Sequence, residues 1–267
     1  MKDALQLKKE QRIASFVYSG VALSLLQYVP LFDGISAKII KETSFCVGLK
    51  ALGGGPARRI IVRNGALVLE EKERTPTDIT LLFINPGDMS NLFRGMKPRI
   101  IPIIKTFRFK AILSDFRTLM SRLQYFMNPD EETLEQHFSH ITGLLIHSAL
   151  RGVKEVAEQD DYVKARVDNI PDGEIALQVA EDPSLETRMR KKGRFFTILP
   201  GPWGENPNAQ LIFKTTRAAH DVLKDRQNAM IALGTMELAI RGRISMIQSL
   251  FPILDRLGYY MNRKGEG

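Results

Sequence analysis

The sequence predicts an α+β protein made of two tandem copies of one domain. The segment Arg122–Met127 returns as Arg256–Met261, 134 positions later (256 − 122). The segment Leu81–Phe83 returns as Leu211–Phe213, at a spacing of 130 (213 − 83). A repeat with a long, nearly fixed period means that one fold must explain both halves of the chain. Two copies are too few for a solenoid, so we expect two globular domains.

Each copy is large enough to form a hydrophobic core of its own. The chain has 267 residues, and we place the domains at 1–128 and 129–267. Its content of 44% apolar and 25% charged residues is ordinary for a soluble globular protein. Disorder is therefore not expected.

A long helix is expected to open each domain. The first extends from Asp3 to Tyr28. The second extends from Glu131 to about Glu158 and follows Asn128-Pro129-Asp130, a typical helix start signal. Acidic residues early in this second helix suit the positive end of its dipole.

Short runs of alternating apolar and polar residues follow each opening helix and predict an antiparallel sheet of about five strands. Between two of these runs, Asn64-Gly65 predicts a tight hairpin. The strands expected in the first domain are Ser44–Leu49, Arg59–Arg63, Ala66–Leu69, Asp78–Phe83 and Thr106–Ala111. Those expected in the second are Glu174–Val179, Gly193–Leu199, Ala209–Phe213 and Met236–Arg241.

Two further helices complete each predicted domain. A short helix follows Asn85-Pro86 in the first domain and Thr215-Thr216 in the second. The last helix carries the repeated segment, and its apolar residues recur at the i, i+3, i+4, i+7 spacing of one helix face. These residues are Phe116, Leu119, Met120 and Leu123, matched by Leu250, Ile253, Leu254 and Leu257.

This order of elements resembles the sterol carrier protein family, a small α+β lipid-binding fold. The segments Ala209–Lys214, Asp221–Leu223 and Thr235–Gly242 resemble its apolar strand, its short helix with a Leu pair and its Gly-x-Leu-x-Ile-x-Gly strand. The resemblance covers about Ala37–Met127 and Ala165–Met261. It implies that each domain holds an apolar molecule between its sheet and its helices.

Large apolar side chains near the fifth strand and the closing helix are the candidates for lining such a cavity. Ligand pockets are usually lined by such residues, although residues of the same kind also fill any hydrophobic core. The candidates in the first domain are Ile101, Ile104, Phe107, Phe109, Leu119 and Leu123. Those in the second are Met230, Leu233, Leu238, Ile240, Leu250, Ile253, Leu254 and Leu257.

The net charge of +8 favours an anionic partner. The basic residues are scattered and not interleaved with aromatic ones, so we expect no nucleic acid partner. The run Arg188–Arg194, together with the loop at Trp203, is a candidate for transient contact with an anionic membrane surface, and a solvated hairpin is the alternative. For Arg122 and Arg256, the alternatives are a bond to helix C-terminal carbonyls and contact with a lipid headgroup.

No residues form a convincing catalytic, metal or cofactor site. His137 and His140 have the spacing to share a metal ion but lack a third ligand at motif spacing. The single cysteine, Cys46, is expected to be a buried, inert thiol. Gly53-Gly54-Gly55 is expected to be a turn and not a phosphate loop. The sequence therefore predicts no enzyme activity, no bound metal and no cofactor.

The function expected from the sequence is the binding and carriage, or presentation, of an apolar lipid of fatty acyl, sterol or isoprenoid type. The alternative is an accessory or scaffold protein that uses its tandem domains to bind a protein partner and has little or no ligand cavity. One cysteine and the lack of a secretory leader predict a cytoplasmic location.

Overall fold

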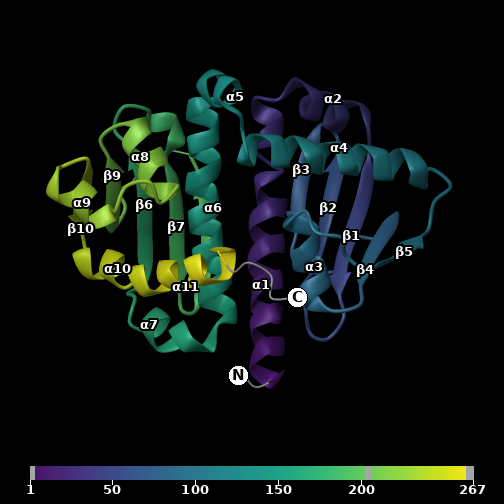
Figure 1. Ribbon diagram of the computed structural model, residues 1–267, viewed down its shortest axis with the longest axis horizontal. Helices are drawn as coiled ribbons and strands as arrows, with labels where there is room; N and C mark the ends of the chain where they lie inside the picture. The colour runs from purple at the N-terminus through teal and green to yellow at the C-terminus, as the bar shows by residue number, and fades with distance from the viewer. Residues whose placement is uncertain (1–3, 202–205, 263–267) are drawn as a thin grey trace. The chain divides into compact units, whose positions relative to one another are not determined.

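The computed structural model describes residues 4–201 and 206–262, and the chain divides into two compact units, Met1–Asp130 and Glu131–Gly267 (Figure 1). Each unit contains one five-stranded sheet with helices. The predicted α+β fold class, with the same fold in both halves, is confirmed.

The elements follow one another in the same general order in both units. Unit 1 consists of α1 (Ala4–Leu25), the 3-10 helix η1 (Val29–Leu31), α2 (Gly34–Glu42), β1 (Phe45–Ala51), β2 (Ala57–Arg63), β3 (Ala66–Glu70), β4 (Ile79–Phe83), α3 (Pro86–Phe93), β5 (Ile100–Ile104) and α4 (Phe109–Met127). Unit 2 consists of α5 (Glu131–Gln136), α6 (Phe138–Gln159), η2 (Asp161–Val163), α7 (Lys164–Asp168), β6 (Gly173–Val179), η3 (Pro183–Leu185), β7 (Thr187–Lys192), β8 (Phe195–Pro200), β9 (Ala209–Phe213), α8 (Thr216–Leu223), α9 (Ala229–Gly234), β10 (Leu238–Gly242), α10 (Ile244–Gln248) and α11 (Phe251–Asn262).

The two sheets have equivalent strand orders, β3-β2-β1-β4-β5 and β8-β7-β6-β9-β10. The first and fourth strands of each unit pair in parallel, and the other neighbours are antiparallel. The sheets are therefore mixed and not wholly antiparallel as expected. The chain leaves the third strand at one edge and returns on the far side of the first strand, which makes the central pair parallel.

This crossover connection runs over one face of the unit 1 sheet, which we call the crossover face. Glu73 of the connection forms an ion pair with Lys50 of β1, with 3.1 Å between Nζ and Oε1. A Cβ atom at Gly48 would lie only 2.9 Å from the methyl group of Thr77. Glycine at this position therefore allows the connection to lie against the strand.

The opposite face, which we call the helix face, holds the core of unit 1. Val47, Ile60 and Ile79 project from this face of three neighbouring strands and are fully buried. Helix α2 contacts β2 and β3, and α3 contacts β1 and β4. Arg58, also on this face, donates from Nε to the Ser19 hydroxyl of α1 at 3.1 Å.

Local signals in the sequence explain the turn and the helix starts. Asn64 and Gly65 have φ values of 54° and 73°, as the predicted two-residue hairpin requires. The Asn85 side chain caps α3 by accepting a bond from the Asp88 amide, and Thr215 caps α8 in the same way through Ala218. These three predictions are confirmed.

The fifth strand of unit 1 is the main correction. It is β5, Ile100–Ile104, whereas the predicted strand Thr106–Ala111 covers a turn and the start of α4. Proline is unfavourable inside a sheet because it has no amide hydrogen to donate. Here the amide of Lys105 donates to the Asp78 carbonyl, so it points toward the neighbouring strand β4. Because amide directions alternate along a strand, the Pro102 nitrogen points away from β4, to the outer edge, and no hydrogen bond between strands is lost.

A buried aspartate pairs with the repeated arginine in each unit. In unit 1, Nη2 of Arg122 in α4 lies 2.7 Å from Oδ1 of Asp33. The other oxygen of this carboxylate, Oδ2, accepts a bond from the Ser36 amide and so caps α2. In unit 2, Nε of Arg256 in α11 donates to Asp160 at 2.9 Å. The partners of both arginines are therefore aspartates and not the expected helix carbonyls, and each pair joins the closing helix to the segment that follows the opening helix. Contact with a lipid headgroup stays a prediction.

Aromatic rings enclose both arginines. The guanidinium carbon of Arg122 lies 4.6 Å from the ring centre of Tyr125. That of Arg256 lies 4.7 Å from the ring centre of Tyr259, and its Nη2 donates to the Tyr260 hydroxyl at 2.8 Å. The repeated Arg-Leu-x-Tyr segment is therefore the signature of this aspartate contact.

We expect Asp33→Asn to lower the free energy of unfolding by about 2 kcal/mol at neutral pH, because the amide keeps the helix cap but loses the charged pair with Arg122. Burial alone would raise the pKa of Asp33, but hydrogen bonds from Arg122 and Ser36 outweigh it and lower the pKa. Because the pKa of Asp33 is lower in the folded state than in the unfolded state, its ionised form stabilises the fold at pH values above the unfolded-state pKa. This stabilisation is lost as the pH falls through the folded-state pKa.

Urea unfolding at a series of pH values checks this, with Glu73→Gln as the matched control because the Lys50–Glu73 pair is exposed. The control should change the stability by less than about 1 kcal/mol. Equal effects of the two variants, or an Asp33→Asn deficit that does not shrink in acid, would contradict the assignment.

Gly242→Ala should be far more destabilising than Gly65→Ala. Both glycines have a left-handed backbone, with φ of 76° and 73°, which alone costs a larger residue about 1 kcal/mol. At Gly242 the added Cβ would also lie 2.3 Å from the Asn208 carbonyl oxygen, whereas nothing lies within 4 Å at Gly65. Thermal unfolding of the two variants measures the difference, and similar melting temperatures would refute the close approach.

Candidate functional site

The helix layer of unit 1 leaves the fifth strand uncovered. Ile104 of β5 lies opposite Ile79 of β4, so the two side chains are neighbours on the helix face. Ile79 is fully buried, but Ile104 is 43% exposed. Pro102, on the same face of β5, is also exposed. The core of unit 1 therefore continues to its edge as an open apolar surface.

The crossover face of the same strand is apolar as well. Ile101 is 51% exposed and Ile103 is 43% exposed. Phe107 follows the strand, in the turn before α4, and is 92% exposed. Scattered exposed apolar residues are normal, but several in one strand and its adjoining turn form a patch.

The corresponding strand of unit 2 is better covered on its helix face, where Leu238 is buried and Ile240 is partly buried, although Ala239, Arg241 and Gly242 are exposed. Helices α9 and α10 flank β10 along the chain, and both contact it. Leu238 at the start of β10 is buried, whereas Ile100, which has the matching position in β5, is partly buried. In unit 1, residues 94–99, which precede β5 in the place of α9, contain no helix, and the segment that matches α10 at the spacing of 134 is the start of α4. The two units share a fold but differ at this edge.

The candidate cavity residues fall into three groups by exposure. Leu119, Leu123, Leu238, Leu250 and Ile253 are buried; Phe109, Leu233, Ile240, Leu254 and Leu257 are partly buried; Ile101, Ile104, Phe107 and Met230 are exposed. Leu257 packs at Gly152 of α6, where a Cβ atom would lie 2.5 Å from it. Their role in lining a lipid cavity stays a prediction.

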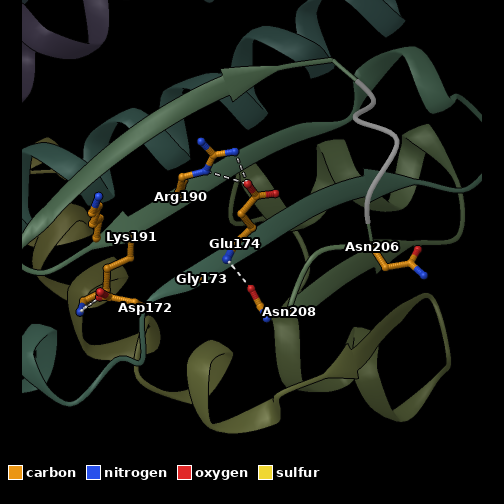
Figure 2. A pocket seen from close by; sticks show the side chains of 8 residues that line it. Asp172, Gly173, Glu174, Arg190, Lys191, Asn206 and Asn208 are labelled. Carbon is orange, nitrogen blue, oxygen red and sulfur yellow. Dashed lines mark hydrogen bonds and ion pairs between the residues drawn. The ribbon is translucent and has the colours of Figure 1, made fainter.

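A pocket of about 440 Å³ lies at the start of β6 in unit 2 (Figure 2). Its lining is polar and consists of Asp172, Gly173, Glu174, Arg190, Lys191, Lys192, Asn206 and Asn208. The Asn208 side chain accepts a bond from the Glu174 amide at 2.8 Å, and its carbonyl accepts one from Arg243. Nothing in the sequence analysis pointed to this pocket, because its residues come from three separate segments.

The charges of this pocket are paired within the fold. The Glu174 carboxylate accepts a bond from Nε of Arg190 at 2.7 Å, as Figure 2 shows, and lies 3.4 Å from Arg188. Lys191 lies 3.3 Å from Asp172. An apolar ligand would meet no apolar side chain among these lining residues, and an anion would compete with the carboxylates already present.

The predicted membrane-docking run Arg188–Arg194 belongs largely to strand β7, which the sequence reading did not assign. Besides the pairs above, Arg188 donates to Glu186 at 2.5 Å and Arg194 to Asp168 at 2.7 Å. The run lies in the β7–β8 hairpin, where Arg188 is buried but Arg190, Lys192 and Arg194 are exposed, as the alternative of a solvated hairpin expects in part. Contact of this run with a membrane stays a prediction. Trp203, the other half of that prediction, lies outside the described residues.

Other candidates for chemistry take part in no cluster. Burial raises the pKa of the Cys46 thiol to about 11, which keeps it protonated and unreactive at neutral pH. Burial also lowers the pKa of His147 to about 4. Among residues 4–201 and 206–262, no three His, Cys, Asp or Glu side chains are grouped so that they could hold a metal ion.

The opening helix of unit 1 is long and apolar. Together with the turn after it, the segment Ala4–Leu31 has the length and composition of a membrane span. Of its most apolar window, 67% is buried within the fold. A buried core helix meets the same criteria, so this segment is weak evidence for a span.

No protein-family model matches the chain, and no curated protein matches it. Solved structures do resemble it. One described as the UbiJ-SCP2 ubiquinone synthesis protein is 15% identical and covers 43% of this chain and 96% of its own, with a TM-score of 0.35. Sterol carrier protein domain 2 of Helicoverpa armigera is 13% identical and covers 46% and 93%, with a TM-score of 0.33.

A crystal structure of sterol carrier protein 2 is 12% identical and covers 44% of this chain and 96% of its own, with a TM-score of 0.32. Each of these structures spans less than half of the chain. They are domains of the family that the sequence resembles, so the expected resemblance is found among solved structures. At these identities the likeness concerns the fold alone.

Proposed function

We propose that the protein binds an apolar lipid, and that unit 1 is the unit that binds it. The observation that carries this proposal is the uncovered fifth strand. Ile104 lies beside the fully buried Ile79 yet is 43% exposed. A fold that buries the rest of this face gains stability when an apolar molecule covers its open end.

The energy of burial is sufficient for such binding. Each methylene group removed from water contributes about 0.8 kcal/mol, so a chain of about ten methylenes gains about 8 kcal/mol before the cost of association. No charged contact is needed. The ligand classes that fit are those with long or extended hydrocarbon, namely fatty acyl, sterol and isoprenoid lipids.

The binding position we propose is the helix face of β5 beside the start of α4. Phe109, in the first turn of α4, is partly buried, and Ile104 ends the strand just before it. Farther along α4, Leu119 and Leu123 are buried and would form the inner end of the site. In this proposal four of the sequence candidates of unit 1, namely Ile104, Phe109, Leu119 and Leu123, act as one continuous surface.

Unit 2 has a supporting role in this proposal. The helix face of its equivalent strand is better covered, since α9 and α10 contact the strand, Leu238 is buried and Ile240 is partly buried. We therefore propose one ligand per chain, held without any covalent step and released to a surface that is equally apolar. The cytoplasmic location stays a prediction from the sequence.

Native mass spectrometry of the freshly purified chain, followed by organic extraction, tests the proposal. We expect one adduct of lipid mass per chain. Ile104→Gln should reduce the loaded fraction at least severalfold, because it places an amide where the hydrocarbon would lie. Met230→Gln is the matched control, since this residue of α9 is exposed in the unit that we expect to remain empty.

A clean apo mass that persists after incubation with fatty acids, phospholipids and sterols would overturn the proposal. Loading that Met230→Gln reduces as much as Ile104→Gln would place the ligand elsewhere. Circular dichroism of both variants shows whether a loss of loading comes from a loss of folding.

A further inference from the structure

We propose that unit 1 docks on the surface of an anionic lipid bilayer through the crossover face of β5 and the turn that follows it. We call this surface the β5 patch. Its apolar members are Ile101, Ile103 and Phe107, and its cations are Lys97, Arg99, Lys105, Arg108 and Lys110. This inference rests on the proposed function and adds to it the partner that would deliver or receive the lipid.

The apolar part of the patch is exposed to a degree that folding alone does not explain. Phe107 is 92% exposed, although a phenylalanine gains more than most residues from burial. Ile101 and Ile103 point to the same face of the strand because side chains alternate. The strand is about 17 Å long, and Phe107 follows three residues after its end. The exposed apolar side chains are therefore spread along the strand and the turn, which we call the apolar ridge.

The charge around the ridge is of one sign. Residues 89–114 contain six cations, Arg94 and the five of the patch, and no acidic residue. Lys97 and Arg99 precede the strand, whereas Lys105, Arg108 and Lys110 follow it. All five patch cations are exposed. Cations therefore stand at both ends of the apolar ridge.

Few acidic groups neutralise these cations. Arg99 lies 3.3 Å from Asp88 but remains largely exposed. Arg108 interacts with Asp115 of α4. No salt bridge within residues 4–201 and 206–262 involves Lys97, Lys105 or Lys110. The patch therefore differs from the run Arg188–Arg194, whose charges are paired inside the fold.

Exposed apolar side chains ringed by cations match the chemistry of an anionic bilayer. Apolar residues can enter the boundary between headgroups and acyl chains to a depth of about 5–10 Å. The cations can stay at the phosphate level, because their long side chains reach outward to water and headgroups. Nucleic acid fits less well, since isoleucine side chains offer no face on which bases stack.

Unit 2 provides an internal contrast. Pairing places Ile104 of β5 opposite Ile79, and Gly242 of β10 at the equivalent position opposite Ala209. By this register, Ala239 and Arg241 stand where β5 has Ile101 and Ile103. At these two strand positions unit 2 therefore has a small side chain and a cation in place of two isoleucines.

Co-flotation of the full chain with vesicles tests the proposal. The chain should bind vesicles of phosphatidylcholine mixed with phosphatidylserine and should bind pure phosphatidylcholine poorly. Lys105→Gln/Lys110→Gln should weaken partitioning roughly 25-fold, at about fivefold for each charge removed. Arg241→Gln/Arg243→Gln removes the same charge from unit 2 and should leave partitioning within about twofold of the parent.

A second variant tests the apolar ridge directly. The chain has one tryptophan, so Trp203→Phe/Phe107→Trp creates a single reporter in the patch. Its emission should shift to shorter wavelength with anionic vesicles, and lipids brominated near the headgroup end of the chain should quench it. Phe107→Ala should weaken partitioning severalfold, and circular dichroism checks that each variant is folded.

Several outcomes would overturn the inference: equal binding to neutral and anionic vesicles, equal losses from the unit 1 and unit 2 charge variants, or an unshifted tryptophan. Binding of a labelled oligonucleotide that depends on Lys105 and Lys110, without vesicle binding, would assign the patch to nucleic acid instead. Lipid loading of the same variants is measured separately by mass spectrometry. A parent chain that loads lipid but does not bind anionic vesicles contradicts this inference alone, whereas a parent chain that loads no lipid contradicts the proposed function.

Discussion

The fold of each unit depends on one contact that joins the two ends of the domain. A buried aspartate after the opening helix binds an arginine of the closing helix, through Asp33 with Arg122 and Asp160 with Arg256. The aspartate also caps the next helical segment, so one carboxylate holds both the start of that segment and the closing helix in place. Because a buried charge is costly without its partner, both residues must be present together. This explains why the repeat is strongest in the closing helices.

Each unit buries one face of its sheet, and the outer strand is the part of that face that is hardest to cover. In unit 2, α9 and α10 contact this strand. Unit 1 has a proline in the strand and exposed isoleucines on both faces. Pro102 keeps another strand from adding to the edge, since the proline nitrogen cannot donate a bond. The apolar side chains are thus protected from strand addition yet left open to an apolar ligand or surface.

Much of this fold was predictable from the sequence, and the errors have physical causes. The Asn64-Gly65 turn and the caps at Asn85 and Thr215 are local effects, so reading the sequence found them. The fifth strand of unit 1 was misplaced because proline argues against a strand, and only the sheet register shows that Pro102 lies on an outer edge. Strand β7 was missed because its cations resemble a solvated segment until their carboxylate partners are brought together by folding.

The sequence could likewise suggest apolar residues for a site but could not rank them. Leu123 and Ile104 are equally apolar in sequence, yet one is buried and the other exposed. The difference between the units depends on which helices cover a strand, and periodicity within one segment carries no such information.

Labelling the full chain with a photoreactive fatty acid, then mapping the modified peptides, tests the central claim most directly. The account predicts labels within residues 100–123 of unit 1; labels confined to unit 2, or none above background, would contradict it.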